Sequence, residues 1–391
     1  MIPEEEAESP LQPLPPAPCE SFLSLPNEIA LNCIARISKM YYPSLSLVSK
    51  TFRSLISSPE LYAERSRLVT TESCLYICLR STTVPFNPRW FSLWVKPNRN
   101  LTDGRIKEKS SGNLFVPLSD PFPPYSNSTV VVGSEIYVIG APMYDNNFEP
   151  SSVVRVYDCR SHTWRDVPNM TRERRNAFAC VLDDKIYVIG GCTCYDKYSS
   201  WFEMFDIETQ TWRNLPTIPD IDVRLAYNWS IDAVEGKIYV KDCRRQGWIY
   251  NVLEGRWTVA ERRSFTHRWL KYWCVIDDVI YCYSYIGYIW YNVESRKWTG
   301  VNGLGAFMKF CCTQGTSNTF AQNMVGLVNY GGKLAVLWYM SVGEKKNIWC
   351  AVITLEKCHN GREISGKIEW VDVVLTVPNS DDDLRCLAIS I

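Results

Sequence analysis

One pattern recurs at a nearly constant interval along most of this chain. An aromatic residue is followed seven positions later by a tryptophan in four places: Tyr157 and Trp164, Phe205 and Trp212, Tyr250 and Trp257, and Tyr291 and Trp298. The successive tryptophans are 48, 45 and 41 residues apart. A tandem unit of about 40–50 residues is the period of a β-propeller blade. We therefore interpret these aromatic residues as packing between strands and blades and not as a ligand cage.

A second pattern precedes each of these pairs. A two-residue turn leads into a strand in residues 183–188 and 235–240, with looser copies in 133–138, 277–281 and 331–336. Aspartate and glycine at the turns tolerate the dihedral angles of a tight hairpin. Together with the aromatic–tryptophan hairpin, this gives four strands in each unit.

The repeat predicts six blades. Four are anchored by the tryptophans, and an elongated fifth runs from about Met324 to Trp370. Residues 75–79 and 90–93 resemble only the last two strands of a further unit. Because an incomplete blade exposes unpaired strand edges, we expect the apolar residues 384–391 to supply the missing strand and close the ring.

The N-terminal part has a different texture. Residues 1–20 are acidic and rich in proline, which predicts a disordered tail. Residues 21–66 predict three helices that begin near Pro26, Pro43 and Pro59. On the first helix Ile29, Cys33 and Ile37 recur at four-residue spacing, and Ala30 and Ile34 widen that apolar face. The second helix is expected to carry the apolar stripe Leu45, Val48, Phe52, Leu55 and Ile56. A linker, residues 67–72, then leads to the repeat region, residues 73–391.

Composition excludes several classes of function. Lys+Arg and Asp+Glu both number 42, so no broad charge field favours nucleic acid or an anionic membrane. No apolar run reaches the length of a membrane span, and no signal peptide is visible at the N-terminus. We therefore expect a cytoplasmic or nuclear location, the sixteen cysteines as thiols, and no structural metal.

The best copy of the repeat resembles a known family. It consists of the turn Asp183-Asp184, the run Ile186-Tyr187-Val188-Ile189-Gly190-Gly191, a strand ending in Phe205-Asp206, and then Trp212. This order resembles the kelch repeat. The resemblance implies a mostly β fold, a six-bladed kelch-type β-propeller, although the double glycine is absent from other copies.

The N-terminal segment carries a second resemblance. Leu25-Pro26-Asn27-Glu28-Ile29 and the later run of residues 47–56 are similar to the F-box, a small α-helical domain that binds the Skp-type adaptor of cullin–RING ubiquitin ligases. The pairing resembles the F-box/kelch-repeat proteins of flowering plants. It implies a substrate-recognition adaptor of a Skp–cullin–F-box (SCF) ligase, with a protein target on the propeller. A kelch interaction scaffold unrelated to ubiquitin remains the alternative.

Two sets of residues are candidate binding sites. The F-box resemblance implies that six residues either hold the helical core or contact the adaptor: Leu25, Pro26, Ile29, Leu47, Val48 and Phe52. Arginines that follow the tryptophans are candidates for binding an acidic target segment: Arg174, Arg175, Arg224, Arg262 and Arg263. The guanidinium fork suits carboxylates. Hydrogen bonds between blades are the other explanation for arginine at these positions.

An enzymatic function is not supported. Some kelch propellers are copper oxidases, but these need several histidines, and this chain has three that lie far apart. No phosphate-binding loop, dinucleotide fingerprint, nucleophile elbow or metalloprotease motif occurs. We therefore expect a non-catalytic protein without a cofactor.

Overall fold

The structure is a computed structural model. It describes residues 22, 25–81, 89–96, 112–118, 128–140, 149–161, 163–192, 201–218, 230–241, 247–259, 273–284, 287–292, 294–295, 297–313, 323–359, 361–379 and 381–391. The chain divides into two compact units, Met1–Thr70 and Thr71–Ile391. The predicted tail of residues 1–20 lies outside the described residues.

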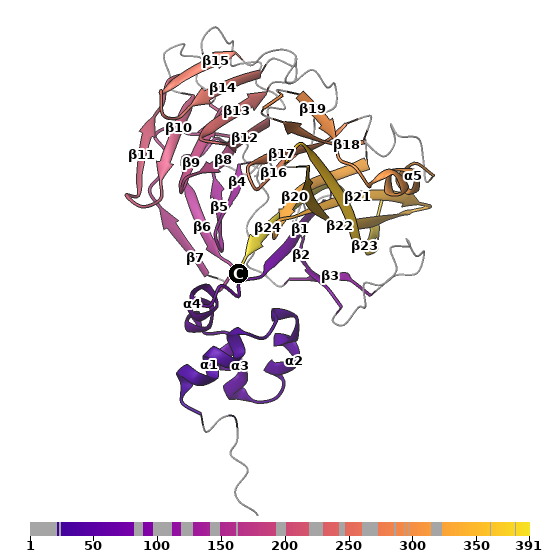
Figure 1. The fold of residues 1–391 in the computed structure, drawn as a ribbon. Helices are drawn as coiled ribbons and strands as arrows, with labels where there is room; N and C mark the ends of the chain where they lie inside the picture. Colours follow the sequence, from indigo (N-terminus) through magenta and orange to yellow (C-terminus); the bar gives the residue numbers. More distant parts are fainter. Residues whose placement is uncertain are drawn as a thin grey trace, which may run out of the picture. The chain divides into compact units, whose positions relative to one another are not determined.

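The first unit is helical. Its elements are α1 (Asn27–Ala35), the 3-10 turn η2 (Lys39–Tyr41), α2 (Tyr42–Ser46), α3 (Lys50–Ile56) and α4 (Pro59–Arg67) (Figure 1). The prediction of one helix across Leu45 to Ile56 is wrong, because it is interrupted between α2 and α3. Ser49 caps the new helix, since its side chain accepts a hydrogen bond from the Phe52 backbone at 3.1 Å.

A buried arginine ties this unit together. Arg65 of α4 is fully buried and donates hydrogen bonds to the carbonyl oxygens of Ala35 (3.2 Å) and Ile37 (2.8 Å) and to the hydroxyl of Tyr42 (2.9 Å). The Ala35 carbonyl at the end of α1 also accepts a hydrogen bond from the Thr70 hydroxyl at 2.8 Å, so Arg65 and Thr70 together satisfy this helix end. A small apolar cluster that includes Ile34 and Tyr42 completes the core.

The second unit consists of six four-stranded antiparallel sheets. In blade order, their strands are: β24 (Asp381–Ser390), β1 (Ser73–Ser81), β2 (Arg89–Trp94), β3 (Leu114–Pro117); β4 (Thr129–Val132), β5 (Glu135–Ile139), β6 (Val154–Asp158), β7 (Thr163–Val167); β8 (Phe178–Leu182), β9 (Lys185–Ile189), β10 (Phe202–Asp206), β11 (Thr211–Asn214); β12 (Ser230–Val234), β13 (Lys237–Lys241), β14 (Gly247–Asn251), β15 (Arg256–Val259); β16 (Trp273–Ile276), β17 (Val279–Ser284), β18 (Gly287–Asn292), β19 (Lys297–Gly300); β20 (Met324–Tyr330), β21 (Lys333–Val342), β22 (Lys345–Cys358), β23 (Glu363–Pro378).

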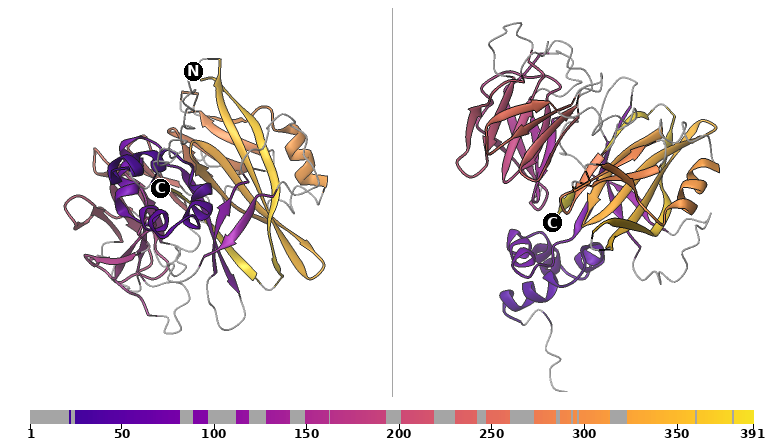
Figure 2. Two further views of the ribbon diagram at one scale, coloured as in Figure 1. Left: turned by 90° about the horizontal axis from the view of Figure 1, so that it is seen from below. Right: turned by 45° about the horizontal axis from the view of Figure 1, so that its top comes forward.

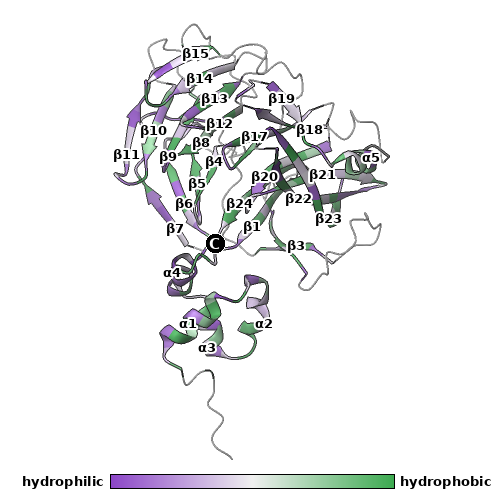
Figure 3. Ribbon diagram, in the orientation of Figure 1, coloured by the Kyte–Doolittle hydropathy of each residue, from purple (hydrophilic) through white to green (hydrophobic). Residues whose placement is uncertain are grey.

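The sheets form a closed propeller. The first strands of neighbouring blades contact one another around the ring: β4 with β8, β8 with β12, β12 with β16, β16 with β20, β20 with β24, and β24 with β4. These strands are therefore the innermost, and fourth strands such as β7 and β11 lie outside, where Figure 3 shows them as largely hydrophilic. The prediction of a six-bladed propeller is confirmed.

The C-terminus closes the ring as expected. Strand β24 pairs with β1 from Ser73 to Ser81, and the backbones of Ile391 and Glu72 exchange two further hydrogen bonds of 2.9 Å. One detail of the prediction is wrong. Residues 75–79 and 90–93 belong to the second and third strands of the first blade, not the last two, because β3 follows them as its outermost strand.

Both repeated patterns have the expected geometry. The turn residues Asp183, Asp184, Asp277 and Asp278 all have positive φ, as the predicted tight hairpins require. The four aromatic–tryptophan pairs are directly opposite each other on adjacent strands, with ring centroids 5.0 to 5.3 Å apart. The expected role of these rings as packing residues is confirmed.

The sixth blade is longer than the others and carries a helix. Helix α5 (Gly305–Thr313) lies beside its extended strands (Figure 2). Phe307 packs against Trp338, with ring centroids 5.8 Å apart, and Phe310 packs against Trp349 at 5.5 Å. The helix thereby covers aromatic surface that the longer strands would otherwise expose.

Candidate functional site

Large apolar side chains remain uncovered on the helical unit. The exposed fractions are 78% for Leu47, 64% for Val48, 50% for Ile29 and 38% for Leu25. Pro26 is exposed as well. Five of the six residues that were predicted to bind an adaptor are therefore available for contact.

The sixth residue has a different role. Phe52 is half-buried among the core side chains and stacks on Phe22, with ring centroids 5.2 Å apart and an angle of 17° between the planes. Sequence reasoning could not separate interface from core among these residues. The structure indicates that Phe52 stabilises the helical unit while the others face outward.

The local backbone explains why these side chains are exposed. On α1, the buried positions are Ala30, Ile34 and Ala35, so the expected face centred on Ile29 and Cys33 is rotated toward solvent. Leu47 and Val48 lie in the interruption between α2 and α3. A residue there no longer follows the helical stripe that would have buried it.

One of the arginines predicted to bind a target, Arg174, lies in the interior of the kelch-like propeller. Arg174 is fully buried in an ion pair with the fully buried Glu203, at 2.7 Å between Nε and Oε1. Its Nη1 also donates to the carbonyl oxygens of Gly190 (2.6 Å) and Trp201 (3.0 Å). The exposure that target binding requires is absent at Arg174, and this part of the prediction is wrong. Arg174 instead connects the loop after the second blade to the third blade. This is the alternative role, hydrogen bonding between blades, that the sequence left open for arginine at this position.

The other arginines are less informative. Arg175 is half-buried, and its backbone N–H donates to the carbonyl oxygen of Gly191 at 2.8 Å. Arg224, Arg262 and Arg263 lie outside the described residues. A role for these four in holding a target stays a prediction.

Comparison with known proteins covers both units. The family model described as F-box domain matches residues 22–64, and the one described as FKB95, Kelch-repeats domain matches residues 90–375. Among relatives from Arabidopsis thaliana, F-box/kelch-repeat protein At4g29370 is 48% identical, with 100% of both chains covered. F-box/kelch-repeat protein At4g19870 is 42% identical over 97% of this chain and 95% of the relative.

The chain belongs to the F-box/kelch-repeat family. The helical unit is accordingly its F-box, and the exposed apolar side chains described above lie on that F-box or directly at its start. The two resemblances noted in the sequence are confirmed.

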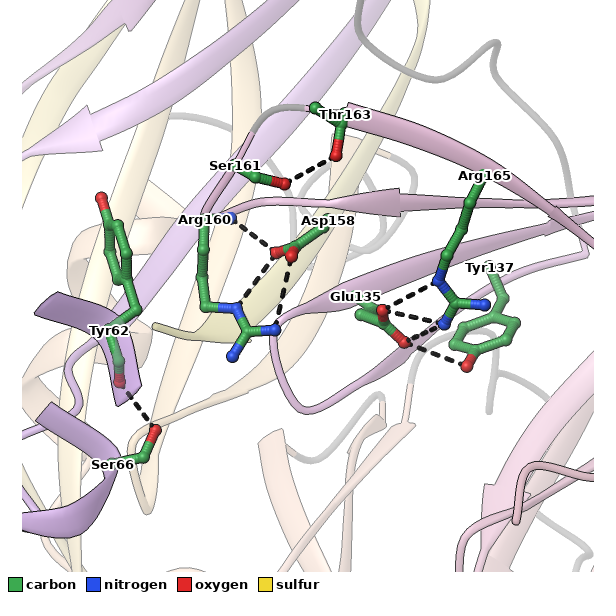
Figure 4. Close-up of polar contacts among 9 residues, drawn as sticks. All are labelled: Tyr62, Ser66, Glu135, Tyr137, Asp158, Arg160, Ser161, Thr163 and Arg165. Atoms are coloured by element: carbon green, nitrogen blue, oxygen red, sulfur yellow. Dashed lines mark hydrogen bonds and ion pairs between the residues drawn. The ribbon is translucent and has the colours of Figure 1, made fainter. Parts of the chain in front are cut away.

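Charged residues on the second blade of the kelch propeller are matched with one another. Arg165 binds both carboxylate oxygens of Glu135, at 2.9 and 2.8 Å, and the hydroxyl of Tyr137 donates to the same carboxylate at 3.1 Å (Figure 4). Burial raises the pKa of Tyr137 to about 12. Arg160 pairs with Asp158 in the neighbouring turn. Because these charges are satisfied within the blade, they are weak candidates for target recognition.

The kelch propeller offers no obvious metal centre in its described part. Among the described residues of the chain, no three His, Cys, Asp or Glu side chains are grouped closely enough to hold a metal ion. Cys180 and Cys274 are free thiols, and burial raises the pKa of both.

Within the described ranges no helix has the length and apolar character of a membrane span.

Proposed function

We propose that this F-box/kelch-repeat protein is a substrate-recognition adaptor of an SCF-type ubiquitin ligase. Its F-box binds the Skp-type adaptor and, through it, a cullin–RING ligase. The kelch propeller holds a protein target. The chain itself performs no chemistry, because an adaptor acts by raising the effective concentration of target lysines near the charged ubiquitin-conjugating enzyme.

The observation that carries this proposal is the exposed apolar surface of the F-box. Leu47 and Val48 are adjacent and mostly exposed, and Leu25 and Ile29 add apolar surface at the start of the domain. A helical segment of this size has little core of its own. Exposed large apolar side chains on such a segment are typical of a protein–protein interface.

The test is binding of a purified Skp-type adaptor to the full chain and to the double variant Leu47→Ser/Val48→Ser. Burial of a leucine or valine side chain contributes about 1.5–3 kcal/mol. Both side chains are already partly buried before binding, so the contribution of each is smaller than for full burial. We therefore expect the variant to lose about 2–4 kcal/mol of binding free energy, or at least about 30-fold in affinity.

The matched control is Leu253→Ser/Val259→Ser on the kelch propeller. Leu253 and Val259 are 95% and 66% exposed, so this change removes comparable apolar surface from the other unit. The control should bind the adaptor normally. Absence of adaptor binding by the unmodified chain would favour the alternative, a kelch scaffold unrelated to ubiquitin.

The target is a protein that the propeller captures, and its chemistry stays open. Affinity purification with the proteasome inhibited, followed by mass spectrometry, would identify proteins that accumulate on the unmodified chain. A true substrate should also accumulate on Leu47→Ser/Val48→Ser, because that variant keeps the propeller but cannot deliver the target to the ligase. Imaging of the tagged chain in the same cells would test the expected cytoplasmic or nuclear location.

A further inference from the structure

A groove lies between α1 and α4 of the F-box. It has a volume of about 580 Å³. Apolar lining comes from Ile29, Leu31 and Ala63, and acidic lining from Glu28 and Glu60. Ile29 is half-exposed, so this groove continues directly from the apolar surface assigned above to adaptor binding.

One further carboxylate in the groove is already neutralised. Glu64 accepts hydrogen bonds from Arg67 at 2.6 and 2.8 Å and from the side-chain amide of Asn32 at 2.6 Å. The hydrogen bonds from Arg67 lower the pKa of Glu64 to about 2, so it stays ionised and paired at any physiological pH. Glu64 and Arg67 therefore add no net charge to the groove.

Glu28 and Glu60 are the charges that remain. Both are exposed, and within the described part of the chain neither forms an ion pair. Each lies in the first turn of its helix, where an acidic residue is favoured by the helix dipole. The dipole explains one acid on each helix, but it does not require both to line the same groove beside apolar side chains.

We infer that this groove receives a segment of the Skp-type adaptor in which an apolar side chain is flanked by lysine or arginine. The inference rests on the proposed function. The apolar side chain would cover Ile29 and Ala63, and the cations would lie over Glu28 and Glu60. This arrangement gives the apolar centre and polar rim of a protein interface, with complementary charge that sets the orientation of the partner.

The experiment is a titration of the full-length chain with the recombinant Skp-type adaptor in about 50 mM and about 300 mM NaCl. The variant is Glu28→Gln/Glu60→Gln, which keeps the shape of both side chains and removes their charge. At low salt we expect a loss of affinity of about 3- to 20-fold, because exposed pairs are worth little individually. At high salt, where the pairs of the unmodified chain are screened, the loss should shrink to less than about twofold.

The matched control is Glu208→Gln/Glu294→Gln. It removes the same number of charges from exposed turns of the propeller, and its affinity should equal that of the unmodified chain at both salt concentrations. If the unmodified chain does not bind the adaptor at all, the proposed function fails, and this inference fails with it. If the unmodified chain binds, the inference alone is overturned by a Glu28→Gln/Glu60→Gln variant with unchanged affinity, or by a loss that is equal at both salt concentrations.

Discussion

Asp232 lies at an unfavourable position in the propeller, and replacing it with asparagine should stabilise the protein. It is in the middle of β12, an innermost strand, where Cys180 and Cys274 occupy the corresponding positions of the neighbouring blades. Its carboxylate accepts a hydrogen bond from the Ala233 backbone at 2.9 Å. Burial outweighs that bond and raises the pKa of Asp232 to about 7.

The direction of the pH dependence follows from the raised pKa. An unfolded aspartate has a pKa of about 3.9, so between about pH 4 and about pH 7 the folded state holds a proton that the unfolded state has released. The free energy of unfolding therefore falls as the pH rises through this window and stays low above it. A pKa difference of about three between the folded and unfolded states corresponds to at most about 4 kcal/mol. Because Asp232 keeps partial contact with solvent, we expect Asp232→Asn to gain about 2–4 kcal/mol at pH 8 and about a third of that at pH 5.

Urea denaturation followed by tryptophan fluorescence measures this effect in the propeller alone, since the first tryptophan of the chain is Trp90. Three titratable groups beside Asp232 keep their charge state in this range, because burial raises the pKa of Cys180, Cys274 and Tyr239, the last to about 12. Asp278→Asn, in an exposed turn, is the control and should show no such dependence. A variant at position 232 that is no more stable at pH 8 than the unmodified chain would refute the argument.

Two further predictions concern what holds the ring together. Deletion of residues 384–391 should abolish cooperative unfolding of the propeller or sharply lower the urea concentration at its unfolding midpoint. The deletion removes most of the strand that pairs with β1, together with the buried Ile389 and Ile391. Tryptophan fluorescence measures the midpoint, and an unchanged value would contradict closure of the ring by β24. Arg174→Met should destabilise the propeller by about 3–5 kcal/mol, because it leaves the Glu203 carboxylate buried without its cation. In the same denaturation assay, Arg174→Met/Glu203→Leu should be more stable than Arg174→Met, and equal or lower stability of the double variant would disprove the account of this pair.

The propeller was predictable because its signals are local and repeated. A tight turn with aspartate or glycine at positive φ and an aromatic residue seven positions before a tryptophan each identify a hairpin from a few residues. Their recurrence then gives the blade. The first blade was harder to predict, because its four strands come from both ends of the chain and its outermost strand, β3, carries no tryptophan.

The function of the arginines could not be read from residue type. The planar guanidinium that suits a carboxylate on a target suits a carboxylate of the same chain equally well. Arg174 pairs with Glu203, which is 29 positions later in the sequence, in strand β10. Glu203 lies among the apolar residues Phe202, Met204 and Phe205 of β10. A glutamate in such a run was the available signal, since a buried charge needs a partner.

The adaptor site depends on a feature smaller than any periodic pattern. Leu45, Val48, Phe52 and Leu55 are spaced as one helical stripe, and a continuous helix would have directed Val48 into the core with Phe52. The side chain of Ser49 instead accepts the Phe52 N–H and begins a new helix. That cap is worth about 1 kcal/mol, which is enough to decide between two short helices and one in a segment of marginal stability. The interruption then leaves Phe52 in the core and Leu47 and Val48 outside it, so the bond that divides the helix also creates the apolar surface on which the proposed adaptor binding depends.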